Sequence, residues 1–387
     1  MDAASICSDL VKIRSENPPG DTGDCAEYIG AFLEGLGIRV CYTHGQNNET
    51  NVYSKDQSHS LLINGHSDVV PAISDGWEYP PESGYNDGEW IHGRGSSDMK
   101  GGCASVLAAA KRLSDSGETP AVSFAFVCDE EGGGPNGTRR LIAEHIIHPC
   151  DCLIAEPTPA FAPCIGQKGL FRTVVRFNGE PAHSSLYPFF GNSAVMQAAE
   201  FLMKVKSLHE KTWPVSSEME EILNHSAEIA GENGADMSRV FRHISYNPGI
   251  ITGGERANIV AQKCEIQLDM RLPWGVSVEE IKRELYALLP ENAELSPLTS
   301  SETSLTAPDT KLVKTVCECV GDAYGISCKP MVQWAASDAR ALRVAGFNAV
   351  EYGPGCLETI HGLNEKVSIQ QLNTASEIYE NVIRRYQ

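Results

Sequence analysis

Apolar residues recur along the chain with two different periods, which predict helices and strands in alternation. Apolar positions three and four residues apart predict amphipathic helices over 4–14 and 24–36, and an alanine-rich run predicts a helix over 100–113. Short apolar runs bounded by polar residues predict strands. These strands lie at 61–64, 121–127 and 152–155, and a further helix is predicted at 137–147. Strands that alternate with helices are typical of an α/β fold whose sheet has parallel character.

The pattern changes after Gly169. Residues 171–177 alternate between polar and apolar, as a half-exposed antiparallel strand does. The elements predicted next are a helix at 193–207, strands near 241–246 and 262–270, a helix at 277–289 and a strand near 293–298. This βαββαβ order is the ferredoxin-like plan of a small separate domain.

The α/β pattern resumes near residue 308. A helix, a loop at Ser337-Asp338 and a strand at 348–352 are predicted there. We therefore predict a discontinuous catalytic α/β domain, a sheet with flanking helices formed by 1–167 and 304–387. A ferredoxin-like α+β domain at 168–303 is inserted into it.

Charge and composition narrow the classes of function. The 387 residues contain 31 Lys plus Arg against 51 Asp plus Glu, a net charge of -20. Such a surface repels phosphate backbones and anionic lipids, so neither a nucleic acid nor a membrane is expected as a partner. The first residues lack the basic and apolar regions of a signal peptide, and thirteen scattered cysteines without a C-x-x-C pair indicate reduced thiols. A cytoplasmic protein is expected.

Three adjacent carboxylates, Asp129-Glu130-Glu131, follow the apolar strand at 121–127. Neighbouring carboxylates at the end of a buried strand repel one another and are costly to desolvate unless a positive charge lies among them. A bound divalent metal ion is the usual source of that charge. The sequence therefore points to a metal site at this strand end.

Other residues of metal-ligand type lie just after predicted strands or in loops between strand and helix. They are His66, Asp68, Asp98, Glu156 and His361. In open α/β sheets the carboxyl ends of the strands converge on one crevice, so distant positions can meet there. Two histidines with three carboxylates suit zinc, cobalt or manganese better than calcium, which rarely binds imidazole.

Two competing motifs share these segments. Residues 132–137 match G-x-G-x-x-G between a strand and a helix, as in dinucleotide-binding proteins. A pyrophosphate at this position would face the acidic triplet, so an oxidoreductase is rejected on electrostatic grounds. Residues 65–69 approach a nucleophile elbow, but Val69 occupies the place of the second glycine, so a serine hydrolase is disfavoured.

Five motifs in series resemble the M20 metallopeptidase family, and most closely its acetylornithine deacetylase and succinyl-diaminopimelate desuccinylase branch. The motifs are Gly65-His66-Ser67-Asp68-Val69-Val70-Pro71, Gly93-Arg94-Gly95-Ser96-Ser97-Asp98-Met99-Lys100-Gly101, Asp129-Glu130-Glu131, Ala155-Glu156-Pro157, and Gly353-Pro354-Gly355 through His361. They occur in the family's order over nearly the whole chain, including the inserted domain. Five motifs in order are far more specific than any one alone.

The resemblance implies a site for two divalent metal ions, zinc first, with cobalt or manganese as substitutes. His66 and Glu156 would bind one ion, Glu131 and His361 the other, and Asp98 would bridge them. Two ions about 3.5–4 Å apart lower the pKa of a water and polarise a scissile carbonyl.

The resemblance also implies roles for residues that bind no metal. Asp68 would hydrogen-bond the ring of His66 and fix its tautomer. Glu130 would be the general base, and Asp129 receives no role beyond supporting the turn. His183 in the inserted domain would reach the active site of a partner subunit and stabilise the oxyanion. A homodimer formed through this lid domain is therefore expected.

Three further positions match substrate contacts of the family: Asn258 and Arg271 in the lid and Arg340 in the catalytic domain. An arginine is suited to bind a substrate carboxylate with two hydrogen bonds. The chain departs from the desuccinylases at Gln167-Lys168, where they carry paired basic residues, and residues 130–138 are richer in glycine. These departures shift the expectation slightly from a desuccinylase towards a deacetylase or a general N-acyl-amino-acid deacylase.

The predicted function is hydrolysis of the amide bond of a small N-acyl amino acid or short peptide, the acyl group being acetyl or succinyl. N-acetylornithine and N-succinyl-diaminopimelate are the model substrates. The alternative with the same chemistry is a dipeptidase or a glutamate-type carboxypeptidase. A non-catalytic ligand-binding member of the family is disfavoured because the base and all five ligand positions are present.

Overall fold

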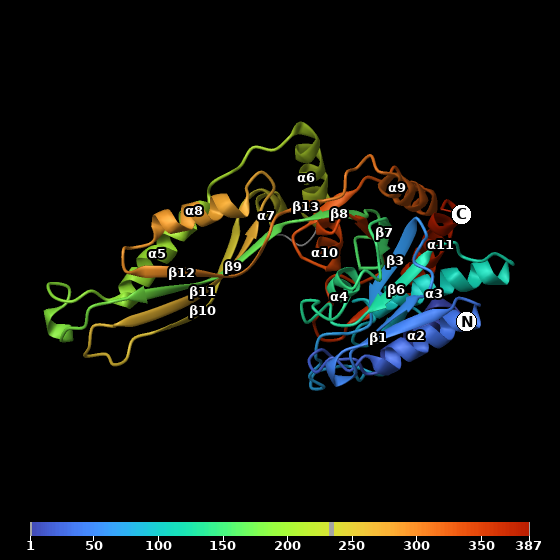
Figure 1. Ribbon diagram of the computed structural model, residues 1–387, viewed down its shortest axis with the longest axis horizontal. Helices are drawn as coiled ribbons and strands as arrows, with labels where there is room; N and C mark the ends of the chain where they lie inside the picture. Colours follow the sequence, from blue (N-terminus) through green and yellow to red (C-terminus); the bar gives the residue numbers. More distant parts are fainter. Residues whose placement is uncertain (1, 232–235, 387) are drawn as a thin grey trace. The chain divides into compact units, whose positions relative to one another are not determined.

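The computed structural model describes residues 2–231 and 236–386, which form two compact units (Figure 1). The first unit contains Met1–Ile165, Leu305–Met331 and Ala336–Gln387, and the second contains Gly166–Ser304 and Val332–Ala335. The inserted unit thus also holds a short segment, Val332–Ala335, that the sequence assigns to the catalytic domain. No helix in these residues has the length and apolarity of a membrane span.

The main sheet of the first unit has parallel strands at its centre. β3 (Leu61–His66) pairs in parallel with β6 (Ser123–Val127) and with β7 (Asp151–Ile154), and β7 pairs in parallel with β15 (Asn348–Glu351). The strand path continues on one side with β2 (Thr50–Ser54) and β1 (Val40–His44), and on the other with β8 (Cys164–Gln167) and β13 (Ser304–Leu305). β14 (Met331–Gln333) lies off this path and pairs with β8. The predicted α/β fold is confirmed.

Helices flank this sheet (Figure 1). They are α1 (Ala3–Lys12), α2 (Gly23–Gly35), α3 (Lys100–Asp115), α4 (Thr138–Ala143), α9 (Lys311–Tyr324), α10 (Asp338–Val344) and α11 (Ile369–Arg384). A small sheet pairs β4 (Tyr85–Asn86), β5 (Trp90–His92) and β16 (Lys366–Ser368). α3 packs between α1 and α11 and against β3. A side chain at Gly102 would place its Cβ 2.0 Å from the Ala155 carbonyl oxygen, so glycine lets α3 approach the segment before Glu156.

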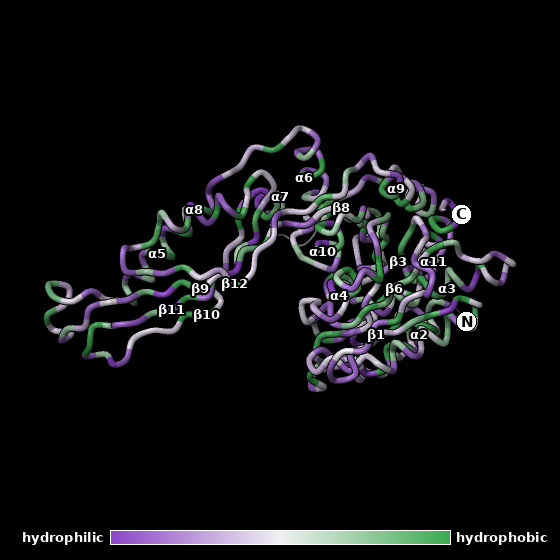
Figure 2. Tube along the Cα trace, in the orientation of Figure 1, coloured by the Kyte–Doolittle hydropathy of each residue, from purple (hydrophilic) through white to green (hydrophobic). Residues whose placement is uncertain are grey.

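The inserted unit is an antiparallel sheet covered by two helices. Its strand order is β10 (Ser245–Gly253), β11 (Lys263–Leu272), β9 (Gly169–Asn178) and β12 (Ala293–Ser301), with α5 (Ala194–His209) and α8 (Val278–Leu288) packed on it. Hydrophobic and hydrophilic residues alternate along β11 (Figure 2). The buried hydrophobic ones form a core with residues of both helices. The predicted ferredoxin-like arrangement is confirmed.

Three local predictions were wrong. The strand predicted from 241 begins only at Ser245, because α6 (Ser217–Ala230) and α7 (Met237–Arg242) precede it, each capped by a side chain at its N-terminus. The loop predicted at Ser337-Asp338 extends only to Ser337, because Asp338 begins α10 and the Ser337 hydroxyl caps this helix by accepting a hydrogen bond from the amide of Ala339. α4 ends at Ala143, before a left-handed residue at His145.

Candidate metal centre

The predicted ligands come from segments at the carboxyl ends of the parallel strands. His66 is the last residue of β3, Glu131 follows β6, and Glu156 lies two residues after β7. Asp98 stands two residues before α3, and His361 lies in the loop between β15 and β16. Parallel strands point these ends in one direction, which explains how residues far apart in sequence lie together.

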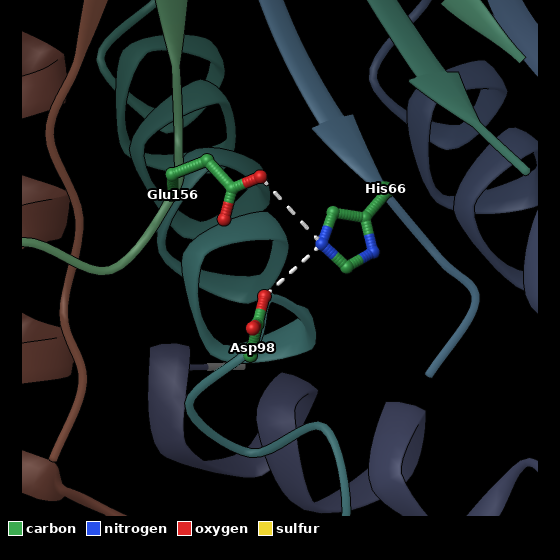
Figure 3. Close-up of side chains that lie close together, drawn as sticks. All are labelled: His66, Asp98 and Glu156. Carbon is green, nitrogen blue, oxygen red and sulfur yellow. Dashed lines mark hydrogen bonds and ion pairs between the residues drawn. The ribbon is translucent and has the colours of Figure 1, made fainter. Parts of the chain in front are cut away.

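The first group of donor atoms is formed by His66, Asp98 and Glu156 (Figure 3). His66 Nε2 lies 3.1 Å from Asp98 Oδ1 and 3.7 Å from Glu156 Oε1. His66 and Glu156 are buried, and the three donor atoms lie within 4.8 Å of one another. A tetrahedral metal ion takes imidazole and carboxylate donors of this kind.

The second group contains Glu131, His361 and the same Asp98. His361 Nε2 lies 3.1 Å from Glu131 Oε1 and 3.3 Å from Asp98 Oδ2. Asp98 therefore directs Oδ1 into one group and Oδ2 into the other. A carboxylate shared in this manner is the geometry that a bridge between two metal ions requires, so the donor set fits two divalent ions.

The electrostatics of the two groups favour a cation. Burial raises the pKa of Glu156 and of Glu131, because their charged forms are desolvated next to Asp98. Burial also opposes ionisation of Asp98, yet hydrogen bonds with His361 and His66 lower its pKa. Hydrogen bonds to Asp98 and Glu131 raise the pKa of His361 to about 10. Three carboxylates around two imidazoles thus leave negative charge that a bound cation would balance.

Asp68 lies behind the first group and is fully buried. The ring nitrogen His66 Nδ1 is 2.9 Å from the backbone oxygen of Asp68 and 3.5 Å from its carboxylate. The Asp68 carboxylate also accepts hydrogen bonds from the backbone amides of Glu130 and Glu131, at 3.1 and 3.0 Å. Asp68 therefore contacts the His66 ring, and it also fixes the backbone of the acidic triplet.

Glu130 lies next to the two donor groups without belonging to either of those found among the described residues. Burial raises its pKa well above the ordinary value for glutamate, and the nearby charges of Asp338 and Glu131 act in the same direction. A carboxyl group that is desolvated, close to the proposed metal ligands and outside both donor groups is suited to exchange a proton at the site.

Asn17 is a residue of this region that the sequence did not indicate. It is buried, and its side-chain nitrogen donates to Asp68 Oδ2 and to Asp129 Oδ1, both at 3.0 Å. Its own amide donates to the Val69 oxygen at 2.8 Å, which holds it beside β3. Asp129 also accepts a hydrogen bond from the amide of Asn136 and has a left-handed φ of 70°. One neutral amide thus separates two buried carboxylates.

The substitution Asn17→Asp is expected to destabilise the protein increasingly as pH rises. A third carboxylate between Asp68 and Asp129 would have a folded-state pKa above its unfolded value, so the folded state binds more protons and stability falls above the unfolded pKa, about 4. Urea unfolding at pH 5 and pH 8 measures this, with exposed Asn47→Asp as the control. An equal stability loss at both pH values would contradict the proposed separation of the carboxylates.

Asp338 and Arg340 lie on α10 and are buried. Asp338 Oδ2 accepts a hydrogen bond of 2.6 Å from the Thr138 hydroxyl, and burial raises the pKa of Asp338 to about 6. Its Oδ1 would lie 3.3 Å from a Cβ at Gly134, so it borders the glycine-rich turn after the acidic triplet. The sequence indicated Arg340 and treated Asp338 only as part of a loop.

The predicted lid residues belong to the second unit. The exposed His183 caps a short 3-10 helix, and its Nδ1 lies 2.8 Å from the Ser185 hydroxyl. The backbone oxygen of Asn258 accepts from the amide of Ser184, and Arg271 Nε donates to Asp269 Oδ1 at 3.0 Å. A cavity of about 470 Å³ is lined by residues including Ser184, Tyr187, Arg256 and Val260, next to His183 and Asn258 in the chain. Arg271 pairs with Ser245, at the other end of β10 and β11 from this cavity. His183 and Asn258 thus lie on neighbouring segments.

Lys168 points into the second unit. Its side chain is fully buried, and its Nζ donates to the backbone oxygens of Val240 and His243 at 2.6 and 2.8 Å. Burial lowers the pKa of Lys168 to about 7. These contacts fix the end of α7 and give Lys168 a structural role within the unit.

Comparison with known proteins places these residues in a family. The model of "Peptidase family M20/M25/M40" matches residues 62–385. A succinyl-diaminopimelate desuccinylase of Helicobacter hepaticus is 28% identical over 86% of this chain and 81% of its own length.

Solved structures share the fold. An M20 family metallo-carboxypeptidase of Sulfolobus solfataricus superposes with a TM-score of 0.77 at 20% identity, covering 100% of this chain and 99% of that one. A dinuclear metal-binding M20 peptidase of Bacillus subtilis has a TM-score of 0.66 at 12% identity, covering 98% of this chain and 96% of that one. The chain belongs to the M20/M25/M40 peptidase family and is a metal-dependent hydrolase that acts on linear amide or peptide C–N bonds.

Proposed function

We propose that this enzyme removes an N-acyl group from an amino acid such as diaminopimelate, and that the preferred acyl group is succinyl. The observation that most supports the chemistry is the pair of donor groups joined through Asp98, with Glu130 beside them. The name of the Helicobacter relative supports succinyl over acetyl. The sequence alone slightly favoured a deacetylase, and we give the relative's name more weight than that expectation.

We propose a site for two divalent ions, with zinc as the preferred metal. The terminal ligands would be His66, Glu156, Glu131 and His361, and Asp98 would be the bridge. Bound ions of this kind supply Lewis-acid chemistry, lowering the pKa of a water and polarising the scissile carbonyl.

The proton transfers are assigned to Glu130. It accepts a proton from the attacking water, whose oxygen adds to the acyl carbon, and it delivers that proton to the amine as the C–N bond breaks. Asp68 holds the ring of His66 and the backbone of Glu130 in the geometry that these steps require.

We further propose that two copies of the chain associate through the inserted unit. Its surface carries large exposed apolar side chains, including Phe189 at 87% and Met203 at 67% exposure, and β10 is an edge strand of its sheet. Exposed apolar groups and an unpaired strand edge are each typical of a protein interface. In such a dimer the exposed His183 would serve the partner subunit's site by stabilising the oxyanion.

Substrate contacts are assigned to Asn258, Arg271 and Arg340, with the guanidinium groups binding carboxylates of the substrate. None of the thirteen cysteines forms a disulfide in the part of the chain that the structure describes, which agrees with the cytoplasm as the proposed compartment.

The substrate is tested by hydrolysis assays of the zinc- or cobalt-loaded enzyme. N-succinyl-diaminopimelate is expected to be cleaved at least tenfold faster than N-acetylornithine and than a panel of dipeptides, measured as kcat/KM from release of the free amine. This ratio corresponds to about 1.4 kcal/mol, the contribution expected of one charge-assisted hydrogen bond to the succinyl carboxylate. Cleavage of dipeptides alone would refute the deacylase assignment in favour of a peptidase.

A further inference from the structure

Two partly exposed cysteines lie next to each other at the end of α9. Cys317 lies on the helix, and Cys328 lies in the segment that follows it. Interaction with the Cys328 thiol and burial raise the pKa of the Cys317 thiol above its ordinary value. The packing of Cys328 against α9 also supports this proximity. Gly321 is four residues after Cys317 and lies on the same face of the helix. A Cβ at Gly321 would lie 3.8 Å from the Cβ of Cys328.

The reversal of the chain after α9 explains this proximity. Gly325 adopts a left-handed conformation, with φ at 68°, and the amide of Ile326 donates back to the Gly321 oxygen at 3.1 Å. A glycine in this position, with a backward hydrogen bond, ends a helix and returns the chain along it. The fold thus places Cys328 against the helix surface that carries Cys317.

The thiol pair also contacts the loop that follows Glu156. Cys328 Sγ donates to the backbone oxygen of Phe161 at 3.3 Å, and the Phe161 ring packs edge-on against Tyr324 of α9 at 4.9 Å between centroids. Tyr352 donates to the Ala160 oxygen of the same loop at 3.0 Å. This loop begins a few residues after Glu156, a proposed metal ligand.

We propose that Cys317 and Cys328 form a reversible regulatory disulfide by exchange with a low-molecular-weight disulfide such as oxidised glutathione. The Cys328 thiolate attacks one sulfur of that disulfide and releases the first glutathione thiolate. The Cys317 thiol then gives its proton to the released glutathione thiolate and attacks the Cys328 sulfur, which releases the second glutathione thiolate. The two protons from the cysteines pass to the two glutathione thiolates, so two protein thiols are oxidised and one small disulfide is reduced.

The disulfide removes the S–H donor that Phe161 has in the reduced protein. Loss of one neutral hydrogen bond in the loop after Glu156 is expected to lower the hydrolysis rate about fivefold, which corresponds to about 1 kcal/mol. This consequence rests on the proposed function, whereas formation of the disulfide does not.

The disulfide is tested on the whole reduced protein incubated with oxidised glutathione and mapped by mass spectrometry. A peptide pair linked through Cys317 and Cys328, lighter by two hydrogens and separated again by dithiothreitol, is expected. Cys317→Ser should instead keep glutathione on Cys328, and Cys150→Ser, which alters another partly exposed cysteine, should retain the link. Absence of the link in the wild type, or a link between other cysteines, would overturn the proposal.

The effect on activity is tested with Cys328→Ser, which keeps a hydroxyl donor for Phe161 and cannot form the disulfide. Oxidised wild type is expected to lose about fivefold in rate and to regain it with dithiothreitol, while treated Cys328→Ser keeps its rate. An unchanged rate in fully crosslinked wild type would refute the coupling to the loop. A reduced protein that hydrolyses no acyl substrate would instead refute the proposed function, with the crosslink result unaffected.

Discussion

Glu130→Gln is expected to abolish turnover while metal content stays near that of the wild type. The amide has the same size as the carboxyl group but cannot accept the proton of the attacking water. General-base catalysis contributes about 10²–10⁴ in rate, so a loss of kcat of this order is expected with KM little changed. Steady-state kinetics and elemental analysis of the same preparation measure both quantities.

The matched control is Glu358→Gln, which makes the same chemical change at an exposed glutamate in the loop before His361. Its kcat should remain within twofold of the wild-type value, about the effect expected for an exposed side chain outside the site. If Glu130→Gln kept substantial hydrolysis, Glu130 would not be the base, and the proton would have to pass through another group.

Glu131→Ala is expected to lose metal as well as activity. The residue supplies one of the donors around His361, so its removal leaves that group with a histidine and a shared carboxylate. Asp98→Ala is expected to have a larger effect, because its two oxygens lie in both groups. Elemental analysis after dialysis should give about one ion per chain for Glu131→Ala and about none for Asp98→Ala.

Glu358→Ala serves as the control for removal of an acidic side chain near the site and should bind metal like the wild type. Circular dichroism of each variant shows whether the fold is intact. Full metal content in Glu131→Ala would contradict its role as a ligand. Loss of the same single ion in both variants would contradict the bridging role of Asp98.

The three residues of the acidic triplet have different surroundings in the structure. Glu131 points to His361, Glu130 stays outside the donor groups, and Asp129 accepts hydrogen bonds from Asn17 and Asn136. Asp129, to which the sequence gives no role beyond supporting the turn, thus ties this turn to the segment around Asn17. The three adjacent carboxylates therefore have three different sets of contacts.

The sequence alone determined the fold class, the order of the two domains and the candidate ligands. Hydrophobic periodicity is a local property, so the buried strands β3 and β6 and the helix α3 were all predicted close to their observed bounds. The motifs of the site were equally visible, because they combine residue types that are costly to bury unless a ligand balances their charge. The family resemblance then gave each position an expected role.

Only the tertiary structure decided how these residues meet. Long-range packing positions Asn17, Asp338 and the two oxygens of Asp98, because their contacts join segments that are far apart in the sequence. The same holds for Lys168, whose burial among backbone oxygens of the second unit has no local signal. Periodicity reports which face of an element is buried, whereas hydrogen-bond partners depend on which elements the fold brings together.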